Sequence, residues 1–281
     1  MKVAVVGAGT MGAGIAQACA SAGHDVSLQD VNESARERGL KSIDSSLSRL
    51  VKKDKLSEQD KADTLNRVTL VGEVEKLSDA EVIVEAVFEN INVKQEVWTN
   101  LSEVANDDAL LATNTSSLSI TEIASFVDKP ERFCGMHFFN PVAVLPLVEV
   151  VNALQTSDET MQRAKSFAEG IGKTPILCED KPGFIVNRLL IPYLNDAVHA
   201  LNEGVASAED IDAAMKMGAN MPIGPLALVD LVGLDVALAA AESLYNEFQD
   251  SKFRIHPLMR QMVRAGKLGR KTGEGFYKYE E

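Results

Sequence analysis

Cysteine is scarce in this chain, and its spacing matches no ligand or disulfide pattern. Among 281 residues there are three cysteines, Cys19, Cys134 and Cys178, and none belongs to a CxxC or Cys/His pattern. An odd number of widely spaced cysteines supports neither a disulfide framework nor a zinc site. We therefore expect three small buried thiols in a reducing compartment, and no metal.

Long apolar runs and an excess of positive charge are also missing. The longest apolar runs, such as residues 236–241, are far shorter than the about 20 residues that a membrane helix needs. A formal net charge of −13 disfavours attraction to nucleic acid or anionic lipid. A predicted strand starts within two residues of Met1 and leaves no room for a signal peptide. The expected protein is cytoplasmic, without membrane or nucleic-acid partners.

Short strands and helices alternate through the first two thirds of the chain. The composition, 46% hydrophobic and 25% charged, is that of a globular protein, and the length allows two cores. Strand-like runs separated by helical patterns predict an α/β fold, with a Rossmann-type, doubly wound and largely parallel sheet. The predicted strands cover residues 3–6, 26–30, 68–71, 82–86, 110–113, 133–137, 147–151 and 175–178.

Helices dominate the remaining sequence. Residues 36–55 and 58–67 are predicted to form a helical arm before the sheet resumes. After residues 180–183 no strand alternation recurs, and helices are predicted at residues 184–203, 208–217, 225–250 and 256–265. We place the domain boundary there, between a dinucleotide-binding domain of residues 1–182 and an all-helical C-terminal domain of residues 183–281.

A glycine-rich turn joins the first predicted strand to the helix of residues 11–22. In GxGxxG, the first glycine makes the turn, the second lets the backbone approach a pyrophosphate, and the third lets the helix pack on the strand. Asp30, about twenty residues further on, is placed to bind the adenosine ribose hydroxyls. Its charge would repel a 2′-phosphate, so the expected cofactor is NAD rather than NADP. The turn consists of Gly7, Ala8, Gly9, Thr10, Met11 and Gly12.

Two ionisable side chains stand inside strongly apolar segments. His137 belongs to the sequence MHFFNP, and Glu149 belongs to LVEVV. An unpaired carboxylate in an apolar interior is costly, so Glu149 needs a partner, and His137 is the nearest candidate in the sequence. A lone histidine here would more often be structural. Beside a dinucleotide fold, however, the pair predicts a general base, His137, whose tautomer and protonated form are stabilised by Glu149.

Other polar positions allow two interpretations each. The sequence NTSS at residues 114–117 follows a predicted strand, where α/β ligands bind, and it also precedes a helix that it could cap. Asn187, just past the domain boundary, could cap its helix or donate a hydrogen bond to a substrate oxygen. A basic cluster on the helical arm is either a solvated helix face or a docking surface for a phosphorylated ligand. It consists of Lys41, Arg49, Lys52, Lys53 and Lys55.

Taken together, these motifs resemble the 3-hydroxyacyl-CoA dehydrogenase family, and most closely its short-chain bacterial branch that acts on 3-hydroxybutyryl-CoA. The match runs nearly end to end. It rests on GAGTMG at residues 7–12, EA at 85–86, EN at 89–90, NTSSL at 114–118, HFFNP at 137–141, EV at 149–150, PGFIVNR at 182–188, GP at 224–225 and GRKTG at 269–273. The resemblance implies a Rossmann domain whose helical arm contacts CoA, and a helical C-terminal domain that forms a homodimer.

The resemblance also implies a role for individual residues. His137 would be the catalytic base, with Glu149 as its partner, while Ser116 and Asn187 would hold the reacting oxygen of the substrate. CoA contacts would involve Ser46 and Lys53, which favours a docking role for Lys53 and leaves both interpretations open for the other lysines. Cofactor contacts would come from residues 7–12, Asp30, Glu89, Lys94, Ser116, Asn140 and Lys271.

The expected activity is reversible, NAD-linked oxidation of an (S)-3-hydroxyacyl-CoA such as 3-hydroxybutyryl-CoA, in fatty acid β-oxidation or butanoate metabolism. One alternative is a β-hydroxyacid dehydrogenase that acts on free acids, but that class generally uses a lysine as its acid/base. Another is a non-enzymatic nucleotide-binding relative, against which the four active-site residues argue. Met221 stands where many relatives carry histidine or tyrosine, which leaves the acyl-chain preference open.

Overall fold

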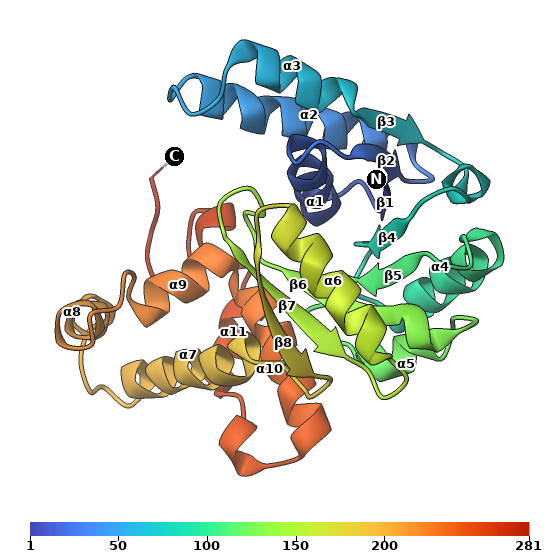
Figure 1. The fold of residues 1–281 in the computed structure, drawn as a ribbon. Helices are drawn as coiled ribbons and strands as arrows, with labels where there is room; N and C mark the ends of the chain where they lie inside the picture. Colours follow the sequence, from blue (N-terminus) through green and yellow to red (C-terminus); the bar gives the residue numbers. More distant parts are fainter. Residues whose placement is uncertain (281) are drawn as a thin grey trace. The chain divides into compact units, whose positions relative to one another are not determined.

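The computed structural model of the protein describes residues 1–280 and contains two compact units (Figure 1). The first unit is Met1–Lys181, and the second begins at Pro182, one residue before the boundary expected from the sequence. Each unit has its own hydrophobic core.

The first unit is built on an eight-stranded sheet with the order β3-β2-β1-β4-β5-β6-β7-β8. Neighbouring strands are parallel except for β6 and β7, which are antiparallel. This confirms the predicted Rossmann-type sheet. The strands are β1 (Lys2–Val6), β2 (Asp25–Gln29), β3 (Val68–Val71), β4 (Val82–Glu85), β5 (Leu110–Thr113), β6 (Phe133–Phe138), β7 (Leu147–Asn152) and β8 (Thr174–Glu179).

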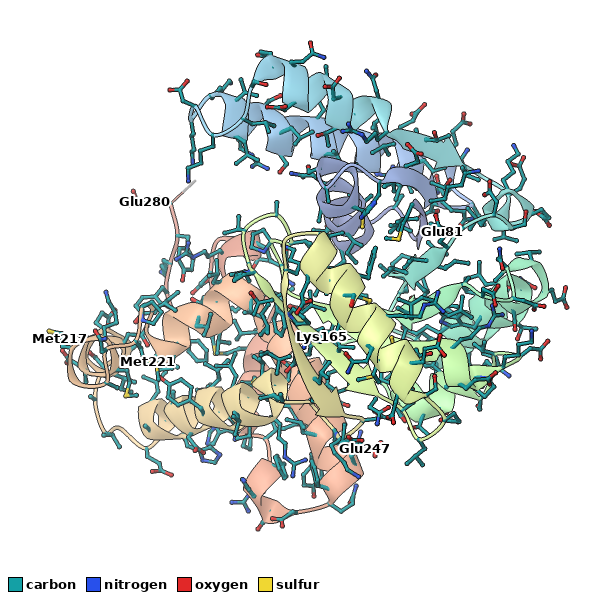
Figure 2. All side chains as sticks on the ribbon, in the orientation of Figure 1. Glu81, Lys165, Met217, Met221, Glu247 and Glu280 are labelled. Carbon is teal, nitrogen blue, oxygen red and sulfur yellow. The ribbon has the colours of Figure 1, made fainter. Side chains whose placement is uncertain are left out.

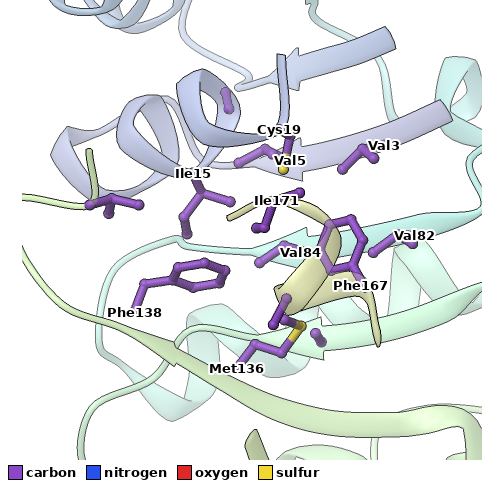
Figure 3. Close-up of a cluster of buried hydrophobic side chains, with 14 of the residues drawn as sticks. Val3, Val5, Ile15, Cys19, Val82, Val84, Met136, Phe138, Phe167 and Ile171 are labelled. Atoms are coloured by element: carbon purple, nitrogen blue, oxygen red, sulfur yellow. The ribbon is translucent and has the colours of Figure 1, made fainter. Parts of the chain in front are cut away.

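Helices cover both faces of this sheet. In Figure 3, Ile15 of α1 and Phe167 of α6 meet Val84 and Met136 of the sheet in one buried cluster. On the opposite face, a Cβ added to Gly135 would lie 2.8 Å from the Ile120 side chain of α5. The helices and 3-10 turns of this unit are α1 (Thr10–Ser21), α2 (Glu33–Val51), α3 (Glu58–Asn66), η1 (Val74–Leu77), α4 (Ile91–Val104), α5 (Ile120–Ala124), η2 (Pro130–Arg132) and α6 (Asp158–Gly170).

The helical arm is the pair α2 and α3, and it corrects both predicted boundaries of the first helix. Asn32 caps α2 by accepting a hydrogen bond from the backbone N–H of Ala35, so the helix begins at Glu33 rather than residue 36. It ends at Val51, so residues 52–55 lie in the following turn. Ile43 and Leu47, four residues apart, anchor α2 in the core. Burial of such side chains contributes about 1.5–3 kcal/mol each.

The second unit consists of helices with a short C-terminal tail packed on them. A single helix over residues 225–250 was the wrong prediction, because Gly233 has φ +102° and separates two helices there. Likewise α7 begins at Val186 rather than residue 184, since Gly183 and Phe184 have positive φ values. The elements are α7 (Val186–Asn202), α8 (Ala208–Gly218), α9 (Pro225–Val232), α10 (Leu234–Phe248), η3 (Ser251–Phe253), α11 (Pro257–Arg264) and η4 (Arg270–Thr272).

Two buried carboxylates, Asp212 and Asp230, hold this unit together. Asp230 accepts hydrogen bonds from the backbone N–H groups of Phe276 and Tyr277, at 2.9 and 3.0 Å, and from the Tyr279 hydroxyl at 3.0 Å. Asp212 accepts bonds from the first turn of α9 and, at 2.7 Å, from the Tyr277 hydroxyl. The tail is therefore fastened to the helices by charge-assisted hydrogen bonds.

The three cysteines carry free thiols. Cys19 and Cys134 are buried as expected, whereas Cys178 on the edge strand β8 is partly exposed, which corrects the prediction for that residue. Burial raises the pKa of each thiol to about 12, so they are protonated near neutrality. Within residues 1–280, no helix has both the length and the apolar character needed to span a membrane. In the same range, no group of three or more histidine, cysteine or acidic side chains is placed to hold a metal ion.

Candidate active site

The predicted site residues of the first unit gather at one edge of the sheet. Strands β1, β2, β4, β5 and β6 run in the same direction, so the loops after them emerge together. The strand order reverses between β1 and β4, which is where ligands bind in open α/β sheets. These loops carry the GxGxxG turn, Asp30, Glu89, Ser116 and Asn140.

The three glycines of the GxGxxG turn differ in what confines them. Gly7 has φ +100°, and a Cβ there would lie 2.7 Å from the Ala86 carbonyl oxygen. A Cβ on Gly12 would lie 1.7 Å from the Gly7 carbonyl oxygen, so the protein itself requires both glycines. A Cβ on Gly9, in contrast, would have no heavy atom within 4 Å. The open space above Gly9, at the N-terminus of α1, fits the close approach of a pyrophosphate.

Asp30 follows β2 and holds the dinucleotide loop. Its Oδ2 accepts a hydrogen bond from the backbone N–H of Ala8 at 3.0 Å, and its Oδ1 accepts one from Asn32 at 2.9 Å. The carboxylate therefore has a defined orientation beside the glycine-rich turn. That position suits the predicted contact with a ribose.

His137 and Glu149 are direct cross-strand partners in the antiparallel pair β6 and β7. The His137 Nδ1 and Glu149 Oε2 atoms lie 2.6 Å apart, and both residues are buried, with 5% and 1% of their surface exposed. Side chains alternate along β6, so Met136 and Phe138 enter the core with α1 and α6 while His137 points to the opposite face. At this distance the carboxylate can accept a hydrogen bond from Nδ1–H, in the tautomer that leaves Nε2 as the nitrogen able to accept a proton.

The loop after β5 places Ser116 beside the same strand. Asn114 Oδ1 accepts a hydrogen bond from the Phe138 N–H at 2.8 Å and joins this loop to the end of β6. Glu89 Oε1 accepts bonds from the backbone N–H groups of Ser116 and Ser117, at 2.7 and 3.0 Å. Ser116 and His137 therefore lie towards the carboxyl ends of two neighbouring parallel strands, β5 and β6.

Glu89 is held ionised by its neighbours. Burial alone would raise its pKa, but Lys94 and the hydrogen bonds from Thr115, Ser116 and Ser117 outweigh burial and lower the pKa below its usual value. The Lys94 ammonium lies 3.7 Å from Glu89 Oε2. Glu89 is therefore a fixed negative charge beside the backbone of Ser116 and Ser117.

Lys94 is fully buried and lies against a second carboxylate, Glu85, which the sequence reasoning assigned no role. Lys94 Nζ and Glu85 Oε1 are 2.6 Å apart, and neither residue is exposed. Trp98 and Thr113 also donate hydrogen bonds to Glu85. The sequence did contain a signal for this cluster. Glu85 ends the apolar run VIVE, and Lys94 and Trp98 are four residues apart, on one face of α4.

Asn140 lies in the loop of residues 139–146 between β6 and β7, which is anchored at both sides. A Cβ on Gly14 of α1 would lie 2.9 Å from the Val142 side chain, so this loop packs closely on the helix that follows the glycine-rich turn. Lys173 donates hydrogen bonds to the carbonyl groups of Val142 and Leu145. Asn140 itself is exposed at the sheet edge.

The candidate CoA contacts lie on the helical arm. Ser46 is on α2 and half-buried, while Lys53 lies in the turn after α2 and is exposed. Lys41, Arg49, Lys52 and Lys55 are exposed as well. The arm thus presents several cations to solvent in an acidic protein, which is compatible with both interpretations of the cluster.

Three further predicted positions belong to the second unit. Asn187 lies in the first turn of α7 and is half-buried. Lys271, in η4, forms an ion pair with Asp235 at the start of α10. Figure 2 shows Met221 just after α8, near Met217, and 40% of Met221 is exposed. Asn187 and Lys271 belong to the second unit, and their roles remain predictions.

Comparisons with known proteins identify the family. Residues 2–181 match the family model "3-hydroxyacyl-CoA dehydrogenase, NAD binding domain", and residues 183–279 match "3-hydroxyacyl-CoA dehydrogenase, C-terminal domain". The chain is 50% identical to a 3-hydroxybutyryl-CoA dehydrogenase of Clostridioides difficile, with 100% of both chains covered. It is 43% identical to the mitochondrial hydroxyacyl-coenzyme A dehydrogenase of Sus scrofa, covering 99% of this chain and 91% of the relative.

Solved structures agree with this assignment. The crystal structure of (S)-3-hydroxybutyryl-CoA dehydrogenase from Ralstonia eutropha superposes with a TM-score of 0.96, is 48% identical, and is matched over 100% of this chain and 99% of that one. The family resemblance seen in the sequence and the expected NAD cofactor are thereby confirmed. The chain belongs to the 3-hydroxyacyl-CoA dehydrogenase family and is an NAD-dependent oxidoreductase of that family.

Proposed function

We propose that this protein interconverts (S)-3-hydroxybutyryl-CoA and acetoacetyl-CoA, with His137 as the acid/base. The observation that carries the proposal is the buried 2.6 Å contact between His137 and Glu149 at the sheet edge that also bears the dinucleotide turn. The names of the relatives in Clostridioides difficile and Ralstonia eutropha support this choice of substrate.

The proposed chemistry follows from the orientation of the histidine. In the oxidative direction, His137 Nε2 takes the proton of the 3-hydroxyl group, and Glu149 stabilises the resulting imidazolium through Nδ1. Ser116 and Asn187 hold the reacting oxygen by hydrogen bonds, which favours the charge that develops on it. NAD supplies the hydride acceptor. In the reductive direction the imidazolium returns the proton to the ketone oxygen.

The cofactor would be held by groups that the geometry makes suitable. The open space at Gly9 and the oriented carboxylate of Asp30 suit a pyrophosphate and a ribose. Glu89, Ser116, Asn140 and Lys271 complete the proposed set of direct contacts, whereas the fully buried Lys94 would support the cofactor through Glu89. Ser46 and Lys53 on the helical arm are the proposed contacts for the CoA moiety, where Lys53 would meet a phosphate.

The direct test measures oxidation of NADH, followed by its absorbance, with acetoacetyl-CoA and with free acetoacetate. We expect activity with the thioester only, and with NADH rather than NADPH. The variant His137→Gln should bind NADH normally yet lose turnover by about 10²–10⁴-fold. His24→Gln is the matched control, because His24 lies at the amino end of β2, at the opposite edge of the sheet. Retention of most of the turnover in His137→Gln would contradict the assignment.

We further propose that the protein is a cytoplasmic homodimer that assembles through its helical unit. Large apolar side chains on that unit are exposed, which supports an interface there. Light scattering of the purified protein should give twice the mass of the chain, and a monomer would contradict the proposal. The most exposed of these side chains are Leu189, Val205, Met217, Leu231 and Val236.

A further inference from the structure

The carboxylate of Glu85 is buried beside the site but takes no part in the proposed chemistry. It is the last residue of β4, and four donors reach it. Its Oε1 accepts from Lys94 Nζ at 2.6 Å and from the Val87 N–H at 2.8 Å. Its Oε2 accepts from Thr113 Oγ1 at 2.7 Å and from Trp98 Nε1 at 3.1 Å. Such a fully satisfied carboxylate has a single orientation.

Stability by itself is a weak reason for this arrangement. Glu85 and Lys94 are both 0% exposed, so each has lost its hydration. A buried ion pair generally gives no more stability than a hydrophobic pair of the same volume, because desolvation offsets the attraction. What the pair does provide is a fixed position for the Lys94 ammonium.

The Lys94 ammonium contacts both Glu85 and Glu89, and so connects the buried carboxylate to the loop that carries Ser116. It lies 3.7 Å from Glu89 Oε2, while Glu89 Oε1 accepts hydrogen bonds from the N–H groups of Ser116 and Ser117. Glu89 therefore places the backbone of Ser116, and Lys94 places Glu89. A displacement of Glu85 would be passed on to the loop that carries Ser116.

A second connection leads from Glu85 to the dinucleotide turn. The hydrogen bond from the Val87 N–H fixes the backbone of residues 86–87. Gly7 packs directly on this segment, since a Cβ there would lie 2.7 Å from the Ala86 oxygen and 3.0 Å from the Val87 nitrogen. Glu85 thus contacts Val87, on whose backbone the dinucleotide turn packs, and Lys94, which contacts Glu89 beside the Ser116 loop.

We propose that Glu85 is a positioning residue for the reaction. Through Lys94 and Glu89, it sets the position of Ser116 relative to the dinucleotide turn. The inference rests on the proposed function, because Ser116 must hold the reacting oxygen for its position to matter. It concerns turnover more than binding of the thioester, since the proposed CoA contacts, Ser46 and Lys53, belong to the helical arm and not to this loop.

The test perturbs Glu85 through Thr113, which is fully buried and lies outside the proposed substrate and cofactor contacts. Thr113→Val is nearly isosteric and removes one donor to the carboxylate. Thr160→Val is the matched control, because Thr160 is also buried in the first unit and donates a hydrogen bond, to the Glu131 carbonyl. We expect a similar loss of stability in both variants. Only Thr113→Val should lower kcat, by about tenfold, with little change in KM for acetoacetyl-CoA.

A double variant separates positioning from general destabilisation. In a Ser116→Ala background, Thr113→Val should cost little further kcat, because the group that it displaces is already gone. Glu85→Gln should lower kcat in the wild-type background by about 10²-fold, as expected for a reacting group moved by about 1 Å. Emission from Trp98, the single tryptophan of the chain, monitors whether the buried cluster remains folded.

The outcomes distinguish this inference from the function on which it rests. If the wild-type protein does not oxidise NADH with acetoacetyl-CoA, the proposed function fails. If the wild type is active but Thr113→Val and Thr160→Val have equal kcat values, the positioning role of Glu85 is wrong while the function stands. Equal losses of kcat from Thr113→Val with and without Ser116→Ala would also overturn it.

Discussion

Replacement of Glu149 by glutamine tests how much the carboxylate contributes to the proposed acid/base. The change keeps the shape of the side chain but removes its charge and places an amide opposite His137 Nδ1, which is 2.6 Å from the carboxylate oxygen. A hydrogen bond to a charged group contributes about 1.5–3 kcal/mol. At about 1.36 kcal/mol per tenfold, its loss in the imidazolium state corresponds to about a 10- to 150-fold decrease in kcat.

The histidine tautomer adds to this decrease. The glutamine amide can donate to Nδ1, which moves the imidazole proton to Nε2, the nitrogen that must accept the hydroxyl proton. The equivalent aspartate-to-asparagine change in a serine protease triad lowers kcat by about 10⁴-fold. We therefore expect Glu149→Gln to lower kcat by about 10²–10⁴-fold, with NADH binding unchanged.

Steady-state assays with acetoacetyl-CoA and NADH measure this effect, with Glu179→Gln as a control. Glu179 is an exposed carboxylate on the neighbouring strand β8, where it accepts a hydrogen bond from the Asn152 side chain at 3.2 Å. A double variant, His137→Gln with Glu149→Gln, should be no slower than His137→Gln alone, because Glu149 acts through the histidine. Near-normal turnover in Glu149→Gln, or independent effects of the two changes, would contradict the proposed role of Glu149.

Three other predictions concern the surroundings of individual buried or loop residues. Gly9→Ala should leave urea unfolding unchanged, because its Cβ would have no heavy atom within 4 Å, but it should raise KM for NADH, because the Cβ would occupy the space proposed for the pyrophosphate. Gly12→Ala should lower stability, since its Cβ would lie 1.7 Å from the Gly7 carbonyl oxygen. Equal effects of the two variants on stability would contradict this prediction. Asp230→Ala should destabilise the helical unit by about 3 kcal/mol or more in urea unfolding, because three donors lose a buried acceptor, and an unchanged midpoint would be the contrary result. Because the pKa of Glu89 is lowered from its ordinary value of 4.5, ionised Glu89 stabilises the fold above pH 4.5, and this contribution is lost as the pH falls through the lowered pKa. The free energy of unfolding of Glu89→Gln, measured as a function of pH, should lack this part of the wild-type pH dependence.

The sequence was sufficient for those features that depend on local pattern. The strand, glycine turn and helix at the N-terminus follow from an apolar run, from GxGxxG and from small residues at helical spacing. The eight predicted strands all exist, with boundaries that differ by no more than one residue at either end. The roles of His137 and Glu149 were suggested by the cost of burying ionisable groups, which is a property of the residues and their immediate neighbours.

Other features required the tertiary structure, because they depend on contacts between residues far apart in the chain. Periodicity could not show that Gly233 interrupts the helix. Gly233 has a positive φ, and a Cβ there would lie 2.9 Å from the side chains of Asp235 and Lys271, so the break depends on a contact with residue 271. Nor could periodicity show that Glu85 accepts from Thr113, 28 residues away. Likewise, the sequence placed His137 and Glu149 in two apolar segments, but only the antiparallel register of β6 and β7 puts them opposite each other at 2.6 Å. Local sequence determines which side chains are buried, whereas strand register and packing decide which of them meet.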